Sequence, residues 1–92
     1  MRRIAVTDTF KDDLKNIRQR GWNENLLWKA VKLIQRGIKL PYKYYDHPLK
    51  AKYIGYRDCH IETDWVLIYK NEKERLILVR TGSHSDLFEK NI

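Results

Sequence analysis

Three strand-forming segments follow one another in the second half of this chain, separated by gaps that are too short to hold a helix. They are rich in β-branched and aromatic residues and span Lys52–Ile61, Asp64–Lys70 and Arg75–Thr81. Strands joined by such short gaps pair as antiparallel hairpins, because parallel pairing needs a long crossover. The run therefore predicts an antiparallel sheet, with Gly55 marking a bend that can divide the first segment.

A short strand and a charged helix open the chain. The strand is expected at Arg2–Val6, and the helix begins after an N-cap at Thr7 or Thr9 and ends near Gly21. Apolar residues recur within this helix at i, i+4 and i+7 and form one narrow stripe: Phe10, Leu14 and Ile17. Only one side of the helix can therefore be buried.

A second helix, with a broader apolar face, comes before the strands. It begins around Asn23 or Asn25 and ends at Gly37, a residue that suits the position after a helix C-terminus. Leu40–Pro48 is expected to be a connector, because its two prolines exclude a regular helix. After the last strand, a short turn or helix is expected around Ser85–Phe88.

The element order β-α-α-β-β-β predicts an α+β fold with a small antiparallel sheet and both helices packed on one sheet face. Ninety-two residues make one domain, residues 1–92, since a second domain would be too small to bury a core. The residues expected to face the helices are Ile54, Val66, Ile68, Ile77 and Val79. The opposite face is then expected to be open to solvent and to carry Trp65, Leu67, Tyr69 and Arg80.

Positive charge is concentrated in the N-terminal half. Residues 1–50 hold 12 Lys and Arg against 5 Asp and Glu, whereas residues 51–92 hold 7 of each. The whole net charge of +7 therefore belongs to the first half. A basic surface of this kind favours an anionic partner, either nucleic acid or an acidic protein.

No membrane span or signal peptide is visible in the sequence. The longest apolar runs, Trp65–Tyr69 and Leu76–Val79, are far shorter than the roughly 20 residues that a bilayer needs. The lone cysteine, Cys59, can form no internal disulfide, which fits a reducing compartment. These features predict a soluble protein of the cytoplasm.

Candidate catalytic residues gather in the C-terminal half. All three histidines, His47, His60 and His84, lie in the segment that also carries Asp58 and Asp64. Imidazoles perform general acid–base chemistry near neutral pH, and two arginines of the same segment, Arg57 and Arg80, suit a phosphate. Strand parity places Asp58 and His60 on one face and Cys59 on the other, which argues against a nucleophilic Cys–His pair.

Each of these residues also has a purely structural interpretation. His60 can belong to a cross-strand polar pair, Trp65 can be a packing residue, and Asp64 can shape a hairpin turn. A metal site is disfavoured because only Asp58 and His60 are close in sequence, with no His-x-x-x-His motif and no second cysteine. If Trp65 is on the open face, it is a candidate to stack on a nucleobase.

Four ordered motifs occupy residues 42–88. They are Asp46-His47-Pro48-Leu49, Gly55-Tyr56-Arg57-Asp58-x-His60, Asp64-Trp65-x-Leu67-Ile68-Tyr69 and Arg80-Thr81-Gly82-x-His84-x-x-Leu87-Phe88. In order and spacing they resemble the YafQ branch of the RelE/ParE-type toxins of bacterial toxin–antitoxin modules. Residues 1–40 share only the strand-helix-helix pattern, and the family fold agrees with the architecture expected above.

The resemblance implies a ribosome-dependent messenger-RNA endonuclease that needs no metal or other cofactor. The 2′-hydroxyl attacks the adjacent phosphate and leaves a 2′,3′-cyclic phosphate and a 5′-hydroxyl. His84 is implied as the general acid and Asp64 or His60 as the base, with His47 and Asp58 completing the cluster. His47 joins the cluster only through the resemblance.

The resemblance also implies substrate contacts and partners. Arg80 is expected to stabilise the charged transition state, Trp65 and Phe88 to position the substrate, and Arg57 to contact it. The basic helices are expected to grip ribosomal RNA, and a cognate antitoxin to cover the basic surface. The chain continues past Phe88 for four residues, Glu89–Ile92, whereas the family often ends near that phenylalanine.

Two other functions stay open at this stage. One is a ParE-like or non-catalytic member of the same superfamily that acts by binding a protein target. The other is a small nucleic-acid-binding domain of unrelated role, which charge and aromatic content alone would support. The three histidines beside two carboxylates favour the nuclease, because a binding module has no need of them.

Overall fold

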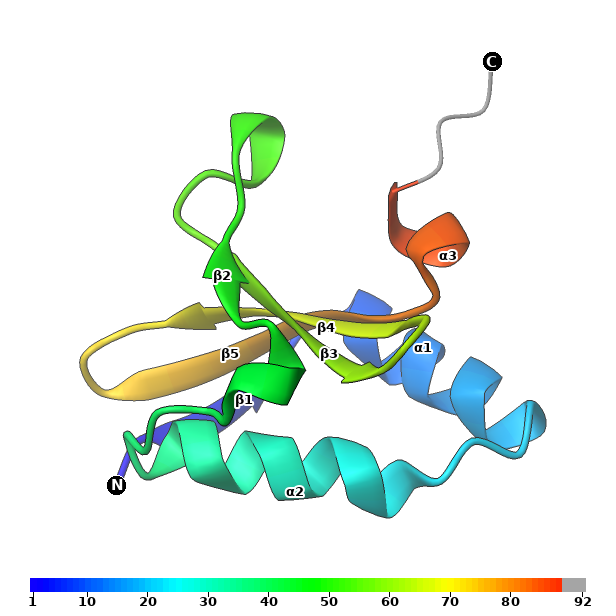
Figure 1. Cartoon of the computed structure of the whole chain (residues 1–92), viewed down its shortest axis with the longest axis horizontal. Coiled ribbons are helices and arrows are strands. Elements are labelled where there is room, and N and C mark those ends of the chain that lie inside the picture. The colour runs from blue at the N-terminus through cyan, green and yellow to red at the C-terminus, as the bar shows by residue number, and fades with distance from the viewer. Residues whose placement is uncertain (89–92) are drawn as a thin grey trace.

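The protein is an α+β fold in which two helices cover one face of a five-stranded sheet (Figure 1). The structure, a computed structural model, describes residues 1–88. Its elements are β1 (Arg3–Val6), α1 (Asp8–Gln19), α2 (Glu24–Gln35), the 3-10 helix η1 (Tyr42–Tyr44), β2 (His47–Pro48), the 3-10 helix η2 (Ala51–Tyr53), β3 (Arg57–Glu62), β4 (Trp65–Asn71), β5 (Arg75–Gly82) and α3 (His84–Phe88).

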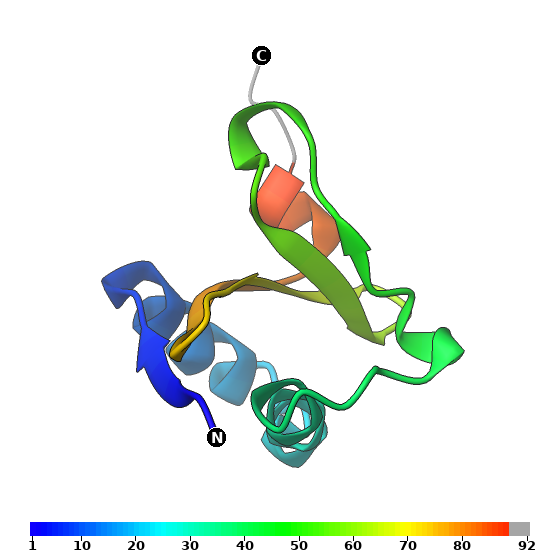
Figure 2. The ribbon, with the colours of Figure 1, turned by 90° about the vertical axis from the view of Figure 1, so that its left-hand side faces the viewer.

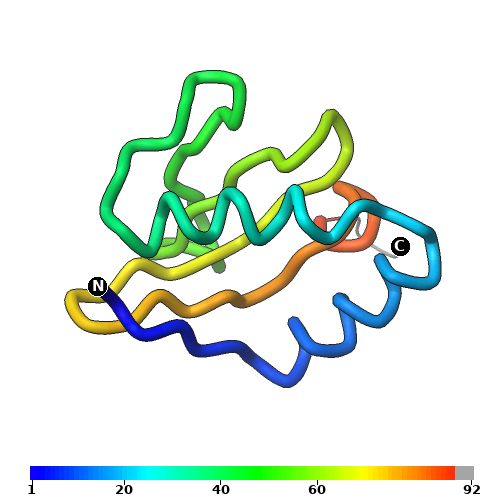
Figure 3. The backbone as a smooth tube through the Cα atoms, turned by 90° about the horizontal axis from the view of Figure 1, so that it is seen from below, coloured from blue at the N-terminus to red at the C-terminus, as the bar shows by residue number. Residues whose placement is uncertain are grey.

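The sheet has the strand order β1-β5-β4-β3-β2. The three long strands β3, β4 and β5 pair antiparallel as the short gaps predict, and β2 adds an antiparallel pair at one edge. At the other edge β1 pairs parallel with β5, so the sheet is mixed (Figure 3). No helix among the described residues is long and apolar enough to cross a membrane.

Capping residues fix the ends of the two long helices. The Thr7 side chain accepts a hydrogen bond from the Phe10 amide at 2.9 Å, and Asn23 accepts one from the Asn25 amide at 3.1 Å. Gly37 follows α2 with φ of 75°, a left-handed conformation that glycine adopts without strain. The predicted helix limits are thus confirmed to within a few residues.

The predicted facing of the central strands is wrong by one residue. Trp65, Leu67 and Tyr69 pack against the helices, whereas Val66 and Ile68 face the other side. On β5 the helix-facing residues are likewise Leu76 and Leu78, rather than Ile77 and Val79, and Ile54 is 76% exposed. Trp65–Tyr69 is apolar at every position, so alternation gave no basis for choosing a face.

The second sheet face is partly covered, which the sequence did not predict. The segment between β2 and β3 and the helix α3 both lie on this face, opposite α1 and α2 (Figure 2). Their side chains form a small second cluster with Val66 and Ile68 of β4 and Val79 of β5: Leu49, Tyr53, Tyr56, Leu87 and Phe88. This explains why β4 is buried on both faces.

The expected first strand, Lys52–Ile61, is shorter in the structure. Its beginning forms η2, and the chain then turns at Gly55, whose φ is 90°. Regular pairing begins at Arg57, so Gly55 does divide the segment. The short strand β2 and the helix η1 lie inside the segment that was expected to be a plain connector.

Candidate active site

His84 and Asp64 form the best-defined pair of the site. His84 begins α3, and Asp64 lies in the tight turn between β3 and β4. One carboxylate oxygen of Asp64 accepts two hydrogen bonds, from His84 Nδ1 at 2.7 Å and from the His84 backbone amide at 3.0 Å. These two bonds lower the pKa of the Asp64 carboxyl, and the bond from the backbone amide has the larger effect.

This pairing fixes which nitrogen of His84 carries a proton. An ionised carboxylate only accepts hydrogen bonds, so Nδ1 must be protonated and Nε2 is the nitrogen that exchanges protons with a substrate. His84 is half exposed, with 46% of its side chain accessible, and is therefore reachable by a ligand.

His60 and Phe88 lie on either side of His84. The ring centroids of His60 and His84 are 5.1 Å apart, and those of His84 and Phe88 are 6.1 Å apart. His60 comes from β3, and its ring makes no hydrogen bond to any residue within 1–88. An unpaired, partly exposed imidazole beside a second imidazole is available to exchange a proton with a ligand.

His47 and Asp58 form a third part of the cluster. They face each other across β2 and β3, which places His47 on the same sheet face as His60. His47 Nδ1 donates to the Tyr45 carbonyl at 2.8 Å and lies 3.1 Å from Asp58 Oδ1. The expectation that His47 belongs near the other histidines, which rested on the resemblance alone, agrees with its position here.

Asp58 is a buried carboxylate with an unmet acceptor. Only 4% of the residue is exposed, and Oδ1 has no hydrogen-bond partner among the described residues. Burial raises the pKa of the Asp58 carboxyl, an effect that the neighbouring His47, His60 and His84 partly oppose. Such a group is costly for the fold, and buried titratable groups of this kind are concentrated at functional sites.

Arg80 lies on the same face and is held by a carboxylate from α1. It faces Ile68 on β4, because Val79 is an extra residue at a bulge in β5. Asp13 accepts from Arg80 Nε at 2.8 Å, from Arg80 Nη2 at 3.0 Å and from the Thr81 amide at 3.1 Å. Arg80 Nη1 has no partner within the described chain, so one edge of the guanidinium is available to an anion.

Trp65 and Arg57, both expected to bind substrate, are not at this cluster. Trp65 is 2% exposed, packs on Trp22 at 5.1 Å and donates to Thr81 Oγ1 at 2.8 Å. Its expected exposure is therefore wrong, and no ring face is left for a nucleobase. Arg57 faces the helix side of the sheet and donates to Asp46 at 3.2 Å.

Cys59 is inert, as strand parity predicts. It is fully buried in the core beneath the helices, on the face opposite His60. Burial raises the pKa of the Cys59 thiol, so the reactive thiolate is disfavoured. No group of three or more His, Cys, Asp or Glu side chains within residues 1–88 is arranged to hold a metal ion.

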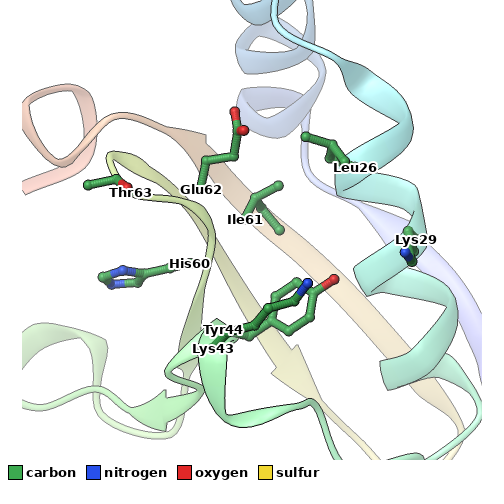
Figure 4. Close-up of a pocket in the computed structure, with 8 residues that line it drawn as sticks. All are labelled: Leu26, Lys29, Lys43, Tyr44, His60, Ile61, Glu62 and Thr63. Atoms are coloured by element: carbon green, nitrogen blue, oxygen red, sulfur yellow. The ribbon is translucent and has the colours of Figure 1, made fainter.

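A basic groove adjoins the cluster on the α2 side of β3. It has a volume of about 670 Å³, and Figure 4 shows His60 projecting from one side of β3 while Ile61 and the α2 residues lie on the other. The groove carries two lysines, Lys29 from α2 and Lys43 from η1. Neither lysine forms an ion pair within the described residues, so both are available for phosphates.

Sequence reasoning did not assign Asp13, Tyr45 or Lys43 individually to this site. Nothing in the sequence reveals that β5 passes beside α1, the helix that carries Asp13. Tyr45 has its ring 4.5 Å from His47 and 5.5 Å from His60. Its position two residues before His47 was the available signal.

Glu89–Ile92, the extension past Phe88, lies outside the described residues. Phe88 itself is described, and it packs on Tyr53 with the two ring centroids 6.2 Å apart, in addition to His84. Phe88 therefore lies beside His84.

Bacterial toxins are among the proteins that resemble this chain in sequence and in structure. The chain is 41% identical over 88 residues to the mRNA interferase toxin YafQ of Escherichia coli (strain B / BL21-DE3), which covers 95% of this chain and 96% of that protein. The E. coli DinJ–YafQ complex superposes with a TM-score of 0.89 at 40% identity, covering 97% of this chain and all of that one. A metal-bound toxin from Helicobacter pylori gives a TM-score of 0.90 at 40% identity, covering 96% of this chain and all of that toxin.

The family model described as "Bacterial toxin of type II toxin-antitoxin system, YafQ" matches residues 2–89, nearly the whole chain. The match includes the N-terminal strand and helices, where the sequence alone showed only the same strand-helix-helix order. The order of elements and the sheet agree with the fold of the solved E. coli DinJ–YafQ complex. The chain therefore belongs to the YafQ family of type II toxin–antitoxin toxins.

Proposed function

We propose that this protein is a messenger-RNA endoribonuclease that acts on translating ribosomes and is the toxin of a toxin–antitoxin pair. The observation that carries the proposal is the imidazole of His84, hydrogen-bonded by Asp64 and lying 5.1 Å from the unpaired ring of His60. Acid–base cleavage of RNA requires one group that accepts a proton and a nearby group that donates one, and these two imidazoles can fill the two roles. The E. coli relative, 41% identical, is named an mRNA interferase toxin.

The reaction follows from these two imidazoles. His60 takes the proton of the 2′-hydroxyl, the oxygen attacks the adjacent phosphorus, and the bond from phosphorus to the 5′-oxygen breaks. His84 gives the Nε2 proton to that leaving oxygen. The products are a 2′,3′-cyclic phosphate and a 5′-hydroxyl, and the two histidines return to their starting states by exchanging protons with water.

Asp64 acts through His84 rather than as the base. Its pKa is lowered and its accepting oxygen already receives two hydrogen bonds from His84, so it is a weak acceptor for a substrate proton. Its contribution is to hold the tautomer and the orientation of the His84 ring, which general acid catalysis needs. Of the two bases that the resemblance leaves open, the geometry favours His60.

The other cluster members surround the reacting phosphate. The free edge of Arg80 suits the extra negative charge of the transition state, and Asp13 holds the guanidinium in place. Phe88 provides an aromatic ring beside His84 for orienting a nucleotide. His47 and Asp58 form a second imidazole–carboxylate pair at the edge of the cluster.

No step in this mechanism uses a metal ion. The H. pylori relative has been solved with a metal bound, whereas two ring nitrogens of the present cluster are already engaged within the chain. Nδ1 of His84 and Nδ1 of His47 both donate hydrogen bonds, to a carboxylate and a backbone carbonyl respectively. These contacts support proton transfer directly.

The charge distribution supports a ribosomal RNA partner. Exposed cations on α2 and in the following segment form no ion pairs with the described carboxylates: Lys29, Lys32, Arg36, Lys39, Lys43, Lys50 and Lys52. Such free cations bind phosphates regardless of sequence. We therefore place the action of the protein on ribosomes, in the cytoplasm, and we expect a cognate antitoxin, as in the E. coli DinJ–YafQ complex.

The test is to express the wild type and His84→Ala under tight control and to map the 5′ ends of cellular messages. The wild type should arrest growth and create new ends in frame with the codons, whereas His84→Ala should do neither. Lys73→Ala, in the turn between β4 and β5, is the matched control and should behave as wild type. Growth arrest without new ends would refute the nuclease and favour a protein-binding toxin.

A further inference from the structure

Tyr45 is an exposed aromatic residue whose backbone is held in an unusual conformation. It follows η1 with φ of 47° and ψ of 48°, the left-handed region that residues other than glycine seldom adopt. Its amide donates to the Tyr42 carbonyl at 2.9 Å, and its carbonyl accepts from His47 Nδ1 at 2.8 Å. These two hydrogen bonds hold the backbone on both sides of Tyr45, and they therefore hold the direction in which its ring projects.

Core packing does not explain the position of the ring. The preceding residue, Tyr44, is 6% exposed and anchors the segment in the core, whereas Tyr45 is 59% exposed. The ring of Tyr45 lies against His47 at 4.5 Å and, edge to face, against His60 at 5.5 Å. A left-handed tyrosine held beside two imidazoles has a cost for the fold, and such strain is concentrated at functional sites.

Tyr45 extends a row of rings that crosses the candidate active site. From one end the row runs His47, Tyr45, His60, His84 and Phe88, with neighbouring centroids 4.5 to 6.1 Å apart. The two histidines of the proposed reaction lie in the middle, with one aromatic ring on each side. A substrate whose phosphate lies between His60 and His84 therefore meets Phe88 on one side and Tyr45 on the other.

We propose that Tyr45 is a nucleobase-binding residue, which stacks on the base of the message nucleotide next to the phosphate that is cut. This inference rests on the proposed function and names a contact that would orient its substrate. Single-stranded RNA is recognised largely by stacking on exposed aromatic rings, which accept every base. The lysines of the adjoining groove, Lys29 and Lys43, lie on the path of the flanking phosphates.

The test compares substitutions that keep the backbone but change the ring. Tyr45→Phe keeps the ring, whereas Tyr45→Asn removes it and still tolerates the left-handed conformation and the carbonyl contact with His47. Tyr42→Asn is the matched control, because Tyr42 is 95% exposed in the same segment and its ring contacts no other ring of the described chain. The assay is the rate of cleavage of a defined message on purified translating ribosomes.

Loss of one base stack should lower kcat/KM of Tyr45→Asn by about 5- to 150-fold. Tyr45→Phe and Tyr42→Asn should stay within about twofold of wild type. The pH profile of Tyr45→Asn should keep its shape, because both imidazoles remain. In a parallel experiment the message carries the fluorescent base 2-aminopurine beside the cleavage site and a 2′-O-methyl group that blocks cleavage. The fluorescence should be quenched when this message binds to wild type or Tyr45→Phe, and less so with Tyr45→Asn.

The outcomes separate the two claims. If wild type cleaves and Tyr45→Asn cleaves as fast, with equal quenching, the stacking role is wrong while the nuclease stands. If Tyr45→Phe is as impaired as Tyr45→Asn, the hydroxyl rather than the ring is required, and stacking is again refuted. If wild type itself leaves the message intact, the proposed function fails, and this inference fails with it.

Discussion

Asp13 links the fold to the candidate active site, and its removal should damage both. The residue is 5% exposed and accepts three hydrogen bonds, two from Arg80 and one from the Thr81 amide. Asp13→Ala leaves a partly buried guanidinium and a buried amide without partners. Groups left unpaired in this way cost about 1 to 3 kcal/mol each, so we expect a loss of about 3 kcal/mol.

In a domain of this size, about 3 kcal/mol corresponds to a decrease in Tm of about 15 °C. Thermal unfolding followed by circular dichroism measures it, with Asp12→Ala, an exposed carboxylate in the same helix, as the control that should change Tm by less than about 3 °C. A double-mutant cycle with Arg80→Met should give a coupling free energy of at least about 1 kcal/mol. A Tm for Asp13→Ala within 3 °C of wild type, or no coupling, would refute this reasoning.

Three further substitutions separate stability from activity. Trp65→Ala should cost about 3 to 5 kcal/mol in the free energy of unfolding by urea titration, whereas Phe88→Ala should keep most of the stability but lose cleavage. Asp58→Asn should raise Tm at pH 7, because the raised pKa of this carboxyl means that its charge disfavours the fold above the unfolded pKa. The gain should vanish below about pH 4. Hydrogen bonds with Arg20 lower the pKa of the Asp86 carboxyl to about 2, from about 4 in the unfolded chain. Asp86 therefore stabilises the fold above about pH 4 and loses that contribution as the pH falls towards about 2. Asp86→Asn should therefore flatten the decrease in Tm between pH 4 and pH 2, and an unchanged acid slope would contradict the pairing.

The sequence predicted the order of elements because each boundary has a local chemical signal. Thr7 and Asn23 cap helices, Gly37 ends one, and Gly55 divides a strand. The parallel pairing of β1 with β5 has no such signal, since nothing local records which distant strand lies beside Arg3–Val6. Long-range pairing is visible only once the chain is folded.

The face of the central strand could not be predicted either. Alternation assigns a face only where one side is polar, and β4 is apolar on both sides because α3 and the segment after β2 cover the second face. Trp65 was therefore expected on the wrong side. Asp58 and His60 on the mixed strand β3 were paired correctly, because the residues between and around them alternate in character.

The general-acid role of His84 is the central claim, and a message with a sulfur atom in place of the bridging 5′-oxygen at the cut tests it most directly. A thiolate leaves without being protonated, so such a message does not need the acid. His84→Ala should cleave the ordinary message at least about 100-fold more slowly than wild type but cleave the sulfur-substituted message at nearly the wild-type rate. An equal loss on both messages would contradict the account.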